Sequence, residues 1–224
     1  MKAMILAAGR GERMRPLTDE LPKPLLEVNE KPLIVYHIEK LAASGFEEII
    51  INIAHLGYKI PECLGDGSAW GIKITYSDEQ ESGALESAGG IIKALPLLGD
   101  EPFLVLNGDV FCDYNFKPDF NLGNSLAHLI LVDNPLHNTN GDFGLENTYV
   151  LNEASVNYTF SGIGYYNPQM FQNLKCEKSA LAPILREYIK KQKVSGELFL
   201  GLWHDIGTPQ RLDDINRILL KDDT

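Results

Sequence analysis

Short apolar segments separated by stretches of helical spacing constrain the fold of this chain more than any other feature. Residues 3–8, 48–53 and 103–106 are mostly apolar, and residues 72–76 and 126–132 add two more strand-like segments. Helices are expected from Pro32 to near Gly45 and over residues 88–95. Buried strands that alternate with helices predict βαβ units and a parallel sheet. Because the spacing is too irregular for an eightfold barrel, we expect an α/β fold, with an open, mostly parallel, Rossmann-like sheet between two helical layers.

The character of the sequence changes after Val132. Residues 133–157 are crowded with Asn, Gly and Asp, which predicts loops and hairpins. Three helices are then expected, beginning at Asn167-Pro168, spanning residues 180–192, and beginning at Thr208-Pro209. No linker or repeat separates the two parts, so we expect a single domain over residues 1–224 with halves at 1–132 and 133–224.

The charge and cysteine content narrow the classes of protein. The chain has 20 Lys and Arg against 31 Asp and Glu, a net charge of −11, which argues against nucleic acid as a partner. The three cysteines lie far apart and are odd in number, which argues against a disulfide framework. The first apolar run is too short for a signal peptide, and no segment approaches the roughly 20 apolar residues of a membrane span. We therefore expect a cytoplasmic protein that acts on small molecules without a membrane.

A loop rich in glycine and arginine follows the first predicted strand, at residues 9–18. Its pattern GxGxR differs from the dinucleotide fingerprint GxGxxG, because position 14 is Met14, and no Walker A string occurs in the chain. Glycines let backbone N–H groups approach an anion, and the guanidinium groups of Arg10, Arg13 and Arg15 suit a triphosphate. Lys23, set between two prolines, follows shortly. A phosphate site is favoured, and a solvated turn with surface cations is the alternative.

Two aspartates are candidates for binding a hard cation. Asp109 ends the string Asn107-Gly108-Asp109, directly after a buried strand, where ligands bind in open α/β sheets. A tight turn is an equally good interpretation of that string alone. Asp205 precedes a glycine turn and, by itself, is best interpreted as a local hydrogen-bonding residue. Together, Asp109 and Asp205 could hold Mg²⁺, with phosphate oxygens and water completing its shell.

Taken together, these segments resemble the sugar-1-phosphate nucleotidylyltransferases. The string GxGxRMxPLT at residues 9–18, the Pro22-Lys23-Pro24 element, the Asp109 string and the string at residues 205–209 occur in that family's order and separations, across essentially the whole chain. The resemblance implies the nucleotide-diphospho-sugar transferase fold. It also implies a reaction in which a nucleoside triphosphate and a sugar 1-phosphate give a nucleotide sugar and pyrophosphate, with Mg²⁺ as cofactor.

The resemblance also implies a role for each candidate residue. Arg13 and Lys23 would be catalytic, and Asp109 and Asp205 would hold the metal. The first half would bind the nucleotide and the second half the sugar. The nucleotide residues would be Ala7, Ala8, Gly9, Gly11, Arg13, Arg15, Glu86, Gly89 and Asn107, and the sugar residues would be Asn107, Asp142 and Gly162. A solvated loop acid at Glu86 and a turn former at Asp142 are the alternatives.

Further strings resemble one branch of the family, the uridylyltransferases that use N-acetylmuramate 1-phosphate in peptidoglycan recycling. They include residues 85–90, 93–100, 128–135, 141–143, 159–163 and 194–197. Ser87, Ala88 and Gly144 depart from that branch. The neighbouring alternatives are mannose-1-phosphate guanylyltransferases and glucose-1-phosphate uridylyl- or thymidylyltransferases. A non-catalytic nucleotide-sugar sensor is a further alternative, but such proteins usually lose the Arg, Lys or Asp of the site, and here all four charged residues are present. A monomer or weak homodimer is expected.

Overall fold

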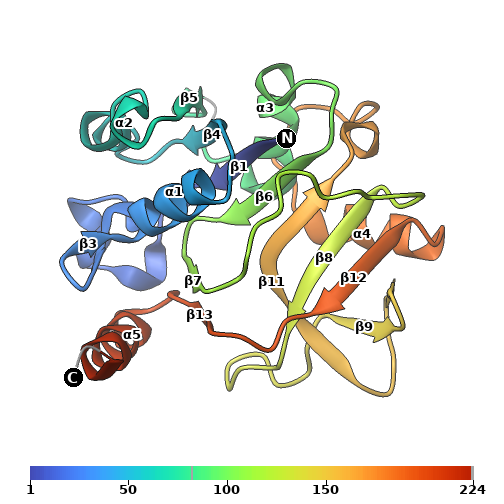
Figure 1. Cartoon of the computed structure of the whole chain (residues 1–224). Coiled ribbons are helices and arrows are strands. Elements are labelled where there is room, and N and C mark those ends of the chain that lie inside the picture. The colour runs from blue at the N-terminus through green and yellow to red at the C-terminus, as the bar shows by residue number, and fades with distance from the viewer. Residues whose placement is uncertain (82, 223–224) are drawn as a thin grey trace.

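A nine-stranded sheet runs through residues 1–81 and 83–222, which the computed structural model describes (Figure 1). The strand order is β5-β4-β1-β6-β11-β8-β12-β10-β9. In chain order the strands are β1 (Lys2–Leu6), β4 (Glu48–Ile53), β5 (Lys73–Asp78), β6 (Phe103–Asn107), β8 (Ala127–Val132), β9 (Phe143–Glu146), β10 (Tyr149–Leu151), β11 (Asn157–Tyr166) and β12 (Val194–Leu198).

The direction of the strands changes along the sheet. The run β5-β4-β1-β6 is parallel throughout, as predicted for the apolar segments of the first half. Beyond β6, strand β11 pairs antiparallel with both β6 and β8, and β12 is parallel to β8. The prediction of a mostly parallel sheet therefore holds for the first half, and the whole sheet is mixed. Short connections link β9, β10 and β11, and short connections join antiparallel neighbours rather than parallel ones.

Helices cover both faces of the sheet, which confirms the three predicted layers (Figure 1). Helices α1 (Leu33–Ala43) and α2 (Lys59–Leu64) pack on the face that carries Ala3 and Ile5. Helices α3 (Glu86–Leu98) and α4 (Leu181–Lys190) pack on the opposite face, which carries Met4. Successive residues of β1 thus serve two cores because side chains alternate along a strand.

A third, smaller core joins the C-terminal helix α5 (Pro209–Asp222) to the glycine-rich loop. It contains Met14 of that loop, Ile206, and Leu212 and Ile215 of α5. Two short ribbons border it, β2 (Glu27–Val28) with β3 (Lys31–Pro32), and β7 (Val110–Cys112) with β13 (Trp203–Asp205). The buried Met14 side chain anchors the loop to this core. This packing explains why a methionine occupies position 14, where the dinucleotide fingerprint GxGxxG would have its third glycine.

One predicted helix is wrong. Asn167 does cap the backbone N–H of Gln169, but only the 3₁₀ turn Pro168–Met170 follows. The next residues, 172–178, are exposed and carry no apolar stripe that could hold a helix against the sheet. The three cysteines are free, and no described helix is long and apolar enough to cross a membrane.

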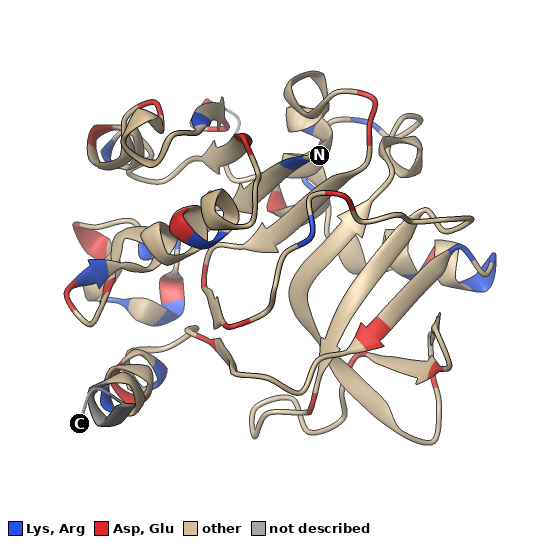
Figure 2. Ribbon diagram, viewed as in Figure 1, with Lys and Arg blue, Asp and Glu red and all other residues tan. Residues whose placement is uncertain are grey.

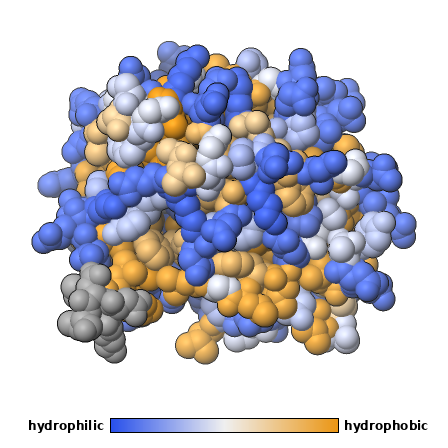
Figure 3. All heavy atoms as spheres, in the orientation of Figure 1, coloured by the Kyte–Doolittle hydropathy of each residue, from blue (hydrophilic) through white to orange (hydrophobic). Residues whose placement is uncertain are grey.

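Charged residues lie mainly on the helices and loops, whereas the central strands carry few of them (Figure 2). On the face shown in Figure 3, hydrophilic side chains dominate the upper part and hydrophobic ones gather along the lower edge. The most exposed large hydrophobic residue described is Leu136, which is 98% exposed and lies in the loop between β8 and β9. The neighbouring residue in that loop, His137, belongs to the site described next.

Candidate active site

A cavity of about 440 Å³ opens beyond the carboxyl ends of β1 and β6. Nine residues predicted to form the site line it: Ala7, Ala8, Gly9, Gly11, Arg13, Lys23, Glu86, Asn107 and Asp109. Asn52, Ser87, Lys178 and Gly207 also line it. The position agrees with the rule that ligands bind outside the carboxyl ends of parallel strands.

The glycine-rich loop is held tightly against the segment that carries Lys23. Gly11 has a φ of 67°, and a Cβ there would lie 3.0 Å from the Thr18 methyl carbon and 3.2 Å from Lys23 Cβ. The Thr18 hydroxyl and the Met14 N–H both donate to the carbonyl of Gly11, at 2.9 and 2.8 Å. Glycine is therefore required at position 11 both for its backbone conformation and for its close packing. The loop is thereby fixed with its backbone facing the cavity.

Lys23 and Asp109 both line the cavity and form an ion pair with each other. The lysine is only 9% exposed and lies in the 3₁₀ turn Lys23–Leu25, between two prolines that restrict its backbone. Asp109 follows β6 at the point where the chain turns into β7. The pair brings together two residues that are 86 positions apart in the sequence.

Asp205 is brought beside Asp109 by the small ribbon of β7 and β13. In the antiparallel register Asp205 lies opposite Val110, and the Ile206 N–H donates to the Asp109 carbonyl at 2.8 Å. Asp109 lies in the turn before β7 and Asp205 at the end of β13, and two neighbouring carboxylates suit a hard divalent cation, which prefers oxygen ligands. Among the described residues no group of three or more His, Cys, Asp or Glu could hold a metal ion. A cation at Asp109 and Asp205 would therefore take its other ligands from substrate phosphates and water.

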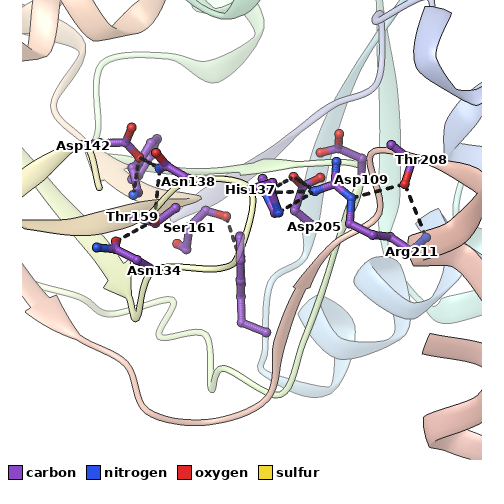
Figure 4. Close-up of polar contacts among 12 residues, drawn as sticks. Asp109, Asn134, His137, Asn138, Asp142, Thr159, Ser161, Asp205, Thr208 and Arg211 are labelled. Atoms are coloured by element: carbon purple, nitrogen blue, oxygen red, sulfur yellow. Dashed lines mark hydrogen bonds and ion pairs between the residues drawn. The ribbon is translucent and has the colours of Figure 1, made fainter. Parts of the chain in front are cut away.

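The Asp205 carboxylate is surrounded by basic groups (Figure 4). Its Oδ2 lies 2.6 Å from Arg211 Nη1 and 3.1 Å from His137 Nε2. A Cβ on Gly207 would lie 2.5 Å from Arg211 Nη2 and 3.1 Å from Arg13 Nη2. Two guanidinium groups, from the first loop and the last helix, therefore border the same small space at the cavity wall.

A buried network of hydrogen bonds joins Ala7 and Asn52, which line the cavity, to Glu79 and Leu85. The Ala7 N–H donates to Asn52 Oδ1 at 2.7 Å, and Asn52 Nδ2 donates to Glu79 Oε1 at 2.8 Å. Glu79, which is 0% exposed, accepts from the Leu85 N–H at 2.8 Å through its other oxygen. The network links the end of β1 to the segment that leads into α3.

Burial also perturbs a histidine close to Asp109. His37 of α1 is buried, and desolvation lowers its pKa to about 4, although the nearby Asp109 carboxylate raises it. The imidazole is therefore neutral at physiological pH. It contributes a polar ring to the core beneath the site and no positive charge.

Five predicted site residues lie outside the cavity lining: Arg15, Gly89, Asp142, Gly162 and Asp205. Arg15 is exposed and pairs with Asp19 at 2.7 Å. Gly89 packs so closely on the Glu177 carbonyl that no Cβ fits, and its N–H donates to the Ser179 carbonyl at 3.2 Å. Packing of the loop before α4 therefore accounts for glycine at position 89.

Two of the three residues predicted to bind the sugar, Asp142 and Gly162, differ in their surroundings. Asp142 accepts hydrogen bonds from the Phe160 N–H at 2.8 Å and from Asn138 Nδ2 at 3.2 Å, so its carboxylate ties a loop to β11 (Figure 4). Gly162 has a φ of 80°, and a Cβ there would come 2.5 Å from the Nδ2 of Asn107, which lines the cavity. Gly162 thus lies directly behind the cavity wall.

The sequence interpretation missed Asn52, Lys178, His137 and Arg211. None of them belongs to a motif that we recognised. Asn52 carried one usable signal, since a polar residue inside an otherwise apolar strand is unusual. Arg211 lies in the first turns of a helix whose start was predicted, but nothing in the spacing shows which of its faces meets Asp205.

Comparison with known proteins defines the class to which this fold and site belong. The sequence model of the family described as nucleotidyl transferase matches residues 2–222. A solved structure from Bacillus anthracis, described as that of a candidate glucose-1-phosphate thymidylyltransferase, superimposes with a TM-score of 0.85 at 25% identity, covering 97% of this chain and 94% of the other. The chain therefore belongs to the nucleotidyl transferase family.

Two individual relatives show which branches of the family this chain resembles. The N-acetylmuramate alpha-1-phosphate uridylyltransferase of Neisseria meningitidis serogroup B is 53% identical over 96% of both chains. The mannose-1-phosphate guanyltransferase of Candida albicans is 33% identical over 94% of this chain and 62% of its own length. These findings confirm the predicted family and the predicted similarity to its N-acetylmuramate branch.

Proposed function

We propose that this protein transfers a uridylyl group from UTP to N-acetylmuramate α-1-phosphate, which yields UDP-N-acetylmuramate and pyrophosphate. The observation that carries the proposal is that Arg13, Lys23 and Asp109 line one cavity and that Asp205 lies beside its wall, next to Asp109 and Gly207, in a chain that is 53% identical to the Neisseria uridylyltransferase along almost its whole length. The activity belongs to the recycling of cell-wall sugars, and we expect it in the cytoplasm, where UTP is available.

In this reaction an oxygen of the sugar phosphate attacks the α-phosphorus of UTP. A new P–O bond forms as the bond to pyrophosphate breaks, so the products are a diphosphate diester and pyrophosphate. The attacking oxygen is already ionised, so no general base is required. Because the two substrates are both strongly anionic, the main task of the protein is to neutralise and position them.

The residues at the cavity divide that task. Backbone N–H groups of residues 8–13 would hold the triphosphate, and Arg13 would neutralise charge on the α-phosphate and on the departing pyrophosphate. Lys23 would bridge toward the attacking phosphate. Asp109 and Asp205 would hold Mg²⁺, which supplies charge neutralisation to the phosphate oxygens when it is bound.

The remaining substrate groups are assigned to the ends of the cavity. We place the base near Ala7, Ala8 and Glu86, where the Asn52–Glu79 network fixes the backbone. We place the sugar toward Asn107 and the backbone of Gly162, with Asp142 shaping the adjacent loop. Glu86 has a φ of 61° and pairs with Lys178 at 3.7 Å, which positions its side chain at the cavity edge.

A guanylyltransferase acting on mannose 1-phosphate is the second candidate, because the Candida relative with that activity is 33% identical over 94% of this chain. A matrix of UTP, GTP and dTTP against the 1-phosphates of N-acetylmuramate, mannose and glucose tests both, with pyrophosphate release as the readout. We expect the highest rate for UTP with N-acetylmuramate 1-phosphate. A higher rate for any other pair contradicts the proposal, and no release with any pair favours a sensor.

A further inference from the structure

Arg211 is a basic residue beside the reactive centre for which the proposed roles above have no use. It lies in the first turns of α5, only 21% exposed, and its Nη1 donates to the Asp205 carboxylate at 2.6 Å. Its Nε also lies 3.4 Å from the Thr208 hydroxyl, and His137 lies against the same guanidinium, at 2.9 Å from Nη1 (Figure 4). These contacts hold Arg211 at a carboxylate that the proposed function assigns to a cation.

The arrangement places two like charges together. Arg211 Nη2 and Arg13 Nη2 both border the space over Gly207, which lines the cavity. Two cations that border the same small space repel each other unless an anion lies near both of them, and here the Asp205 carboxylate is that anion. If a divalent cation binds to Asp205, it neutralises the carboxylate that faces the two guanidinium groups. Another anion is then needed to offset the repulsion between Arg13 and Arg211.

We infer that Asp205 exchanges partners during the reaction: it releases Arg211 when it binds the divalent cation, and Arg211 then binds the phosphate of the sugar 1-phosphate. The inference rests on the proposed function, because it requires a phosphate-bearing sugar and a metal at Asp205. Guanidinium groups suit phosphate because they can donate two parallel hydrogen bonds.

The origin of the residues decides which phosphate Arg211 binds. The loop amides, Arg13 and Lys23 come from the first 23 residues and are assigned to the triphosphate and the bridge between substrates. Arg211 and His137 both come from the half of the chain after Val132, which also supplies Gly162 behind the proposed sugar position. We therefore assign Arg211 to the sugar phosphate and not to pyrophosphate.

Mn²⁺ binding to the substrate-free protein tests the exchange without any turnover. In this assay Arg211→Gln removes a competitor of the cation, so Mn²⁺, followed by electron paramagnetic resonance, should bind about two- to fivefold more tightly, the range expected for a partly exposed ion pair. Arg217→Gln is the matched control, since Arg217 lies on the same helix, is exposed and pairs only loosely with Asp214, at 3.8 Å. Unchanged or weaker Mn²⁺ binding in Arg211→Gln overturns the exchange, because it means that Arg211 merely supports Asp205.

Steady-state kinetics test the phosphate assignment. Arg211→Gln should raise the KM for the sugar 1-phosphate about 10- to 100-fold, the effect of losing a hydrogen bond to a charged group, while the KM for the nucleoside triphosphate changes less than about threefold. Arg211→Lys keeps the charge and should recover part of the loss, which separates binding from misfolding. A rise in the triphosphate KM instead, or no change in either KM, contradicts the assignment.

The two proposals can fail separately. The Mn²⁺ measurement needs no substrate, and the kinetic measurement uses whichever sugar 1-phosphate the wild-type protein accepts. If another sugar proves to be the substrate, the proposed function fails while the exchange at Asp205 is still tested by both assays.

Discussion

Replacing Asn52 by alanine should destabilise the protein and weaken nucleotide binding together. Asn52 is buried, accepts from the Ala7 N–H at 2.7 Å and donates to the Glu79 carboxylate at 2.8 Å. Leaving the Ala7 N–H unsatisfied costs about 1–3 kcal/mol, and the lost hydrogen bond to a buried carboxylate costs about 1.5–3 kcal/mol. We therefore expect the free energy of unfolding to fall by roughly 3–5 kcal/mol.

Urea unfolding measures the stability change, and the KM for the nucleoside triphosphate measures the effect on the cavity. Because Ala7 and Asn52 both line the cavity, we expect that KM to rise about tenfold or more, while the KM for the sugar 1-phosphate changes little. The control is the exposed Asn173→Ala, which should change stability by less than about 0.5 kcal/mol. A loss below about 1 kcal/mol in Asn52→Ala, with an unchanged triphosphate KM, would refute the role given to the network.

Three other perturbations give equally definite expectations. Lys23→Ala should lower kcat about 100-fold or more without changing the circular dichroism spectrum, because it removes the buried partner of Asp109; a near-normal rate would mean that Lys23 has no role in turnover beyond its ion pair with Asp109. Gly162→Ala should cut kcat/KM for the sugar 1-phosphate at least about tenfold, since its Cβ would press on Asn107. Gly123→Ala, at a φ of 57° with nothing within 4 Å, controls for backbone strain, and equal losses in both variants contradict the steric argument. His37 has a pKa of about 4 in the folded chain against 6.5 in the unfolded chain, so as the pH falls the unfolded state binds a proton before the folded state does. The free energy of unfolding, measured with urea, should therefore fall by up to about 3 kcal/mol between pH 6.5 and 4. His37→Asn should remove this pH-dependent loss of stability.

The parallel half of the sheet was predictable because its strands are buried on both faces. Such strands must be apolar along their whole length, so residues 48–53 and 103–106 are recognisable without any knowledge of their partners. Strand β11 was not predicted, because its residues Asn157–Tyr166 mix polar, aromatic and glycine positions and include a register shift. Which residues of β11 are buried depends on its neighbours β6 and β8, and no local pattern in the sequence shows it.

The residues that line the cavity were predictable where several of them fall in one short segment. Glycines and Arg13 in the first loop, and Asp109 after its strand, belong to such segments. Arg211 and Asn52 act through contacts with residues 6 and 45 positions away that depend on helix orientation and strand order. Spacing along the chain does not contain that information, so these residues emerged only from the three-dimensional arrangement.

The central claim is that Asp109 and Asp205, from distant parts of the chain, hold one and the same cation. A double-mutant cycle of Asp109→Asn and Asp205→Asn, with kcat measured over a range of Mg²⁺ concentrations, tests this most directly. If the two residues bind the same ion, either substitution alone already disrupts that ion's site, and the second substitution adds little. The kcat of the double variant should therefore be no more than about tenfold below that of the slower single variant. If the two losses instead multiply, the carboxylates act independently, and the shared site is wrong.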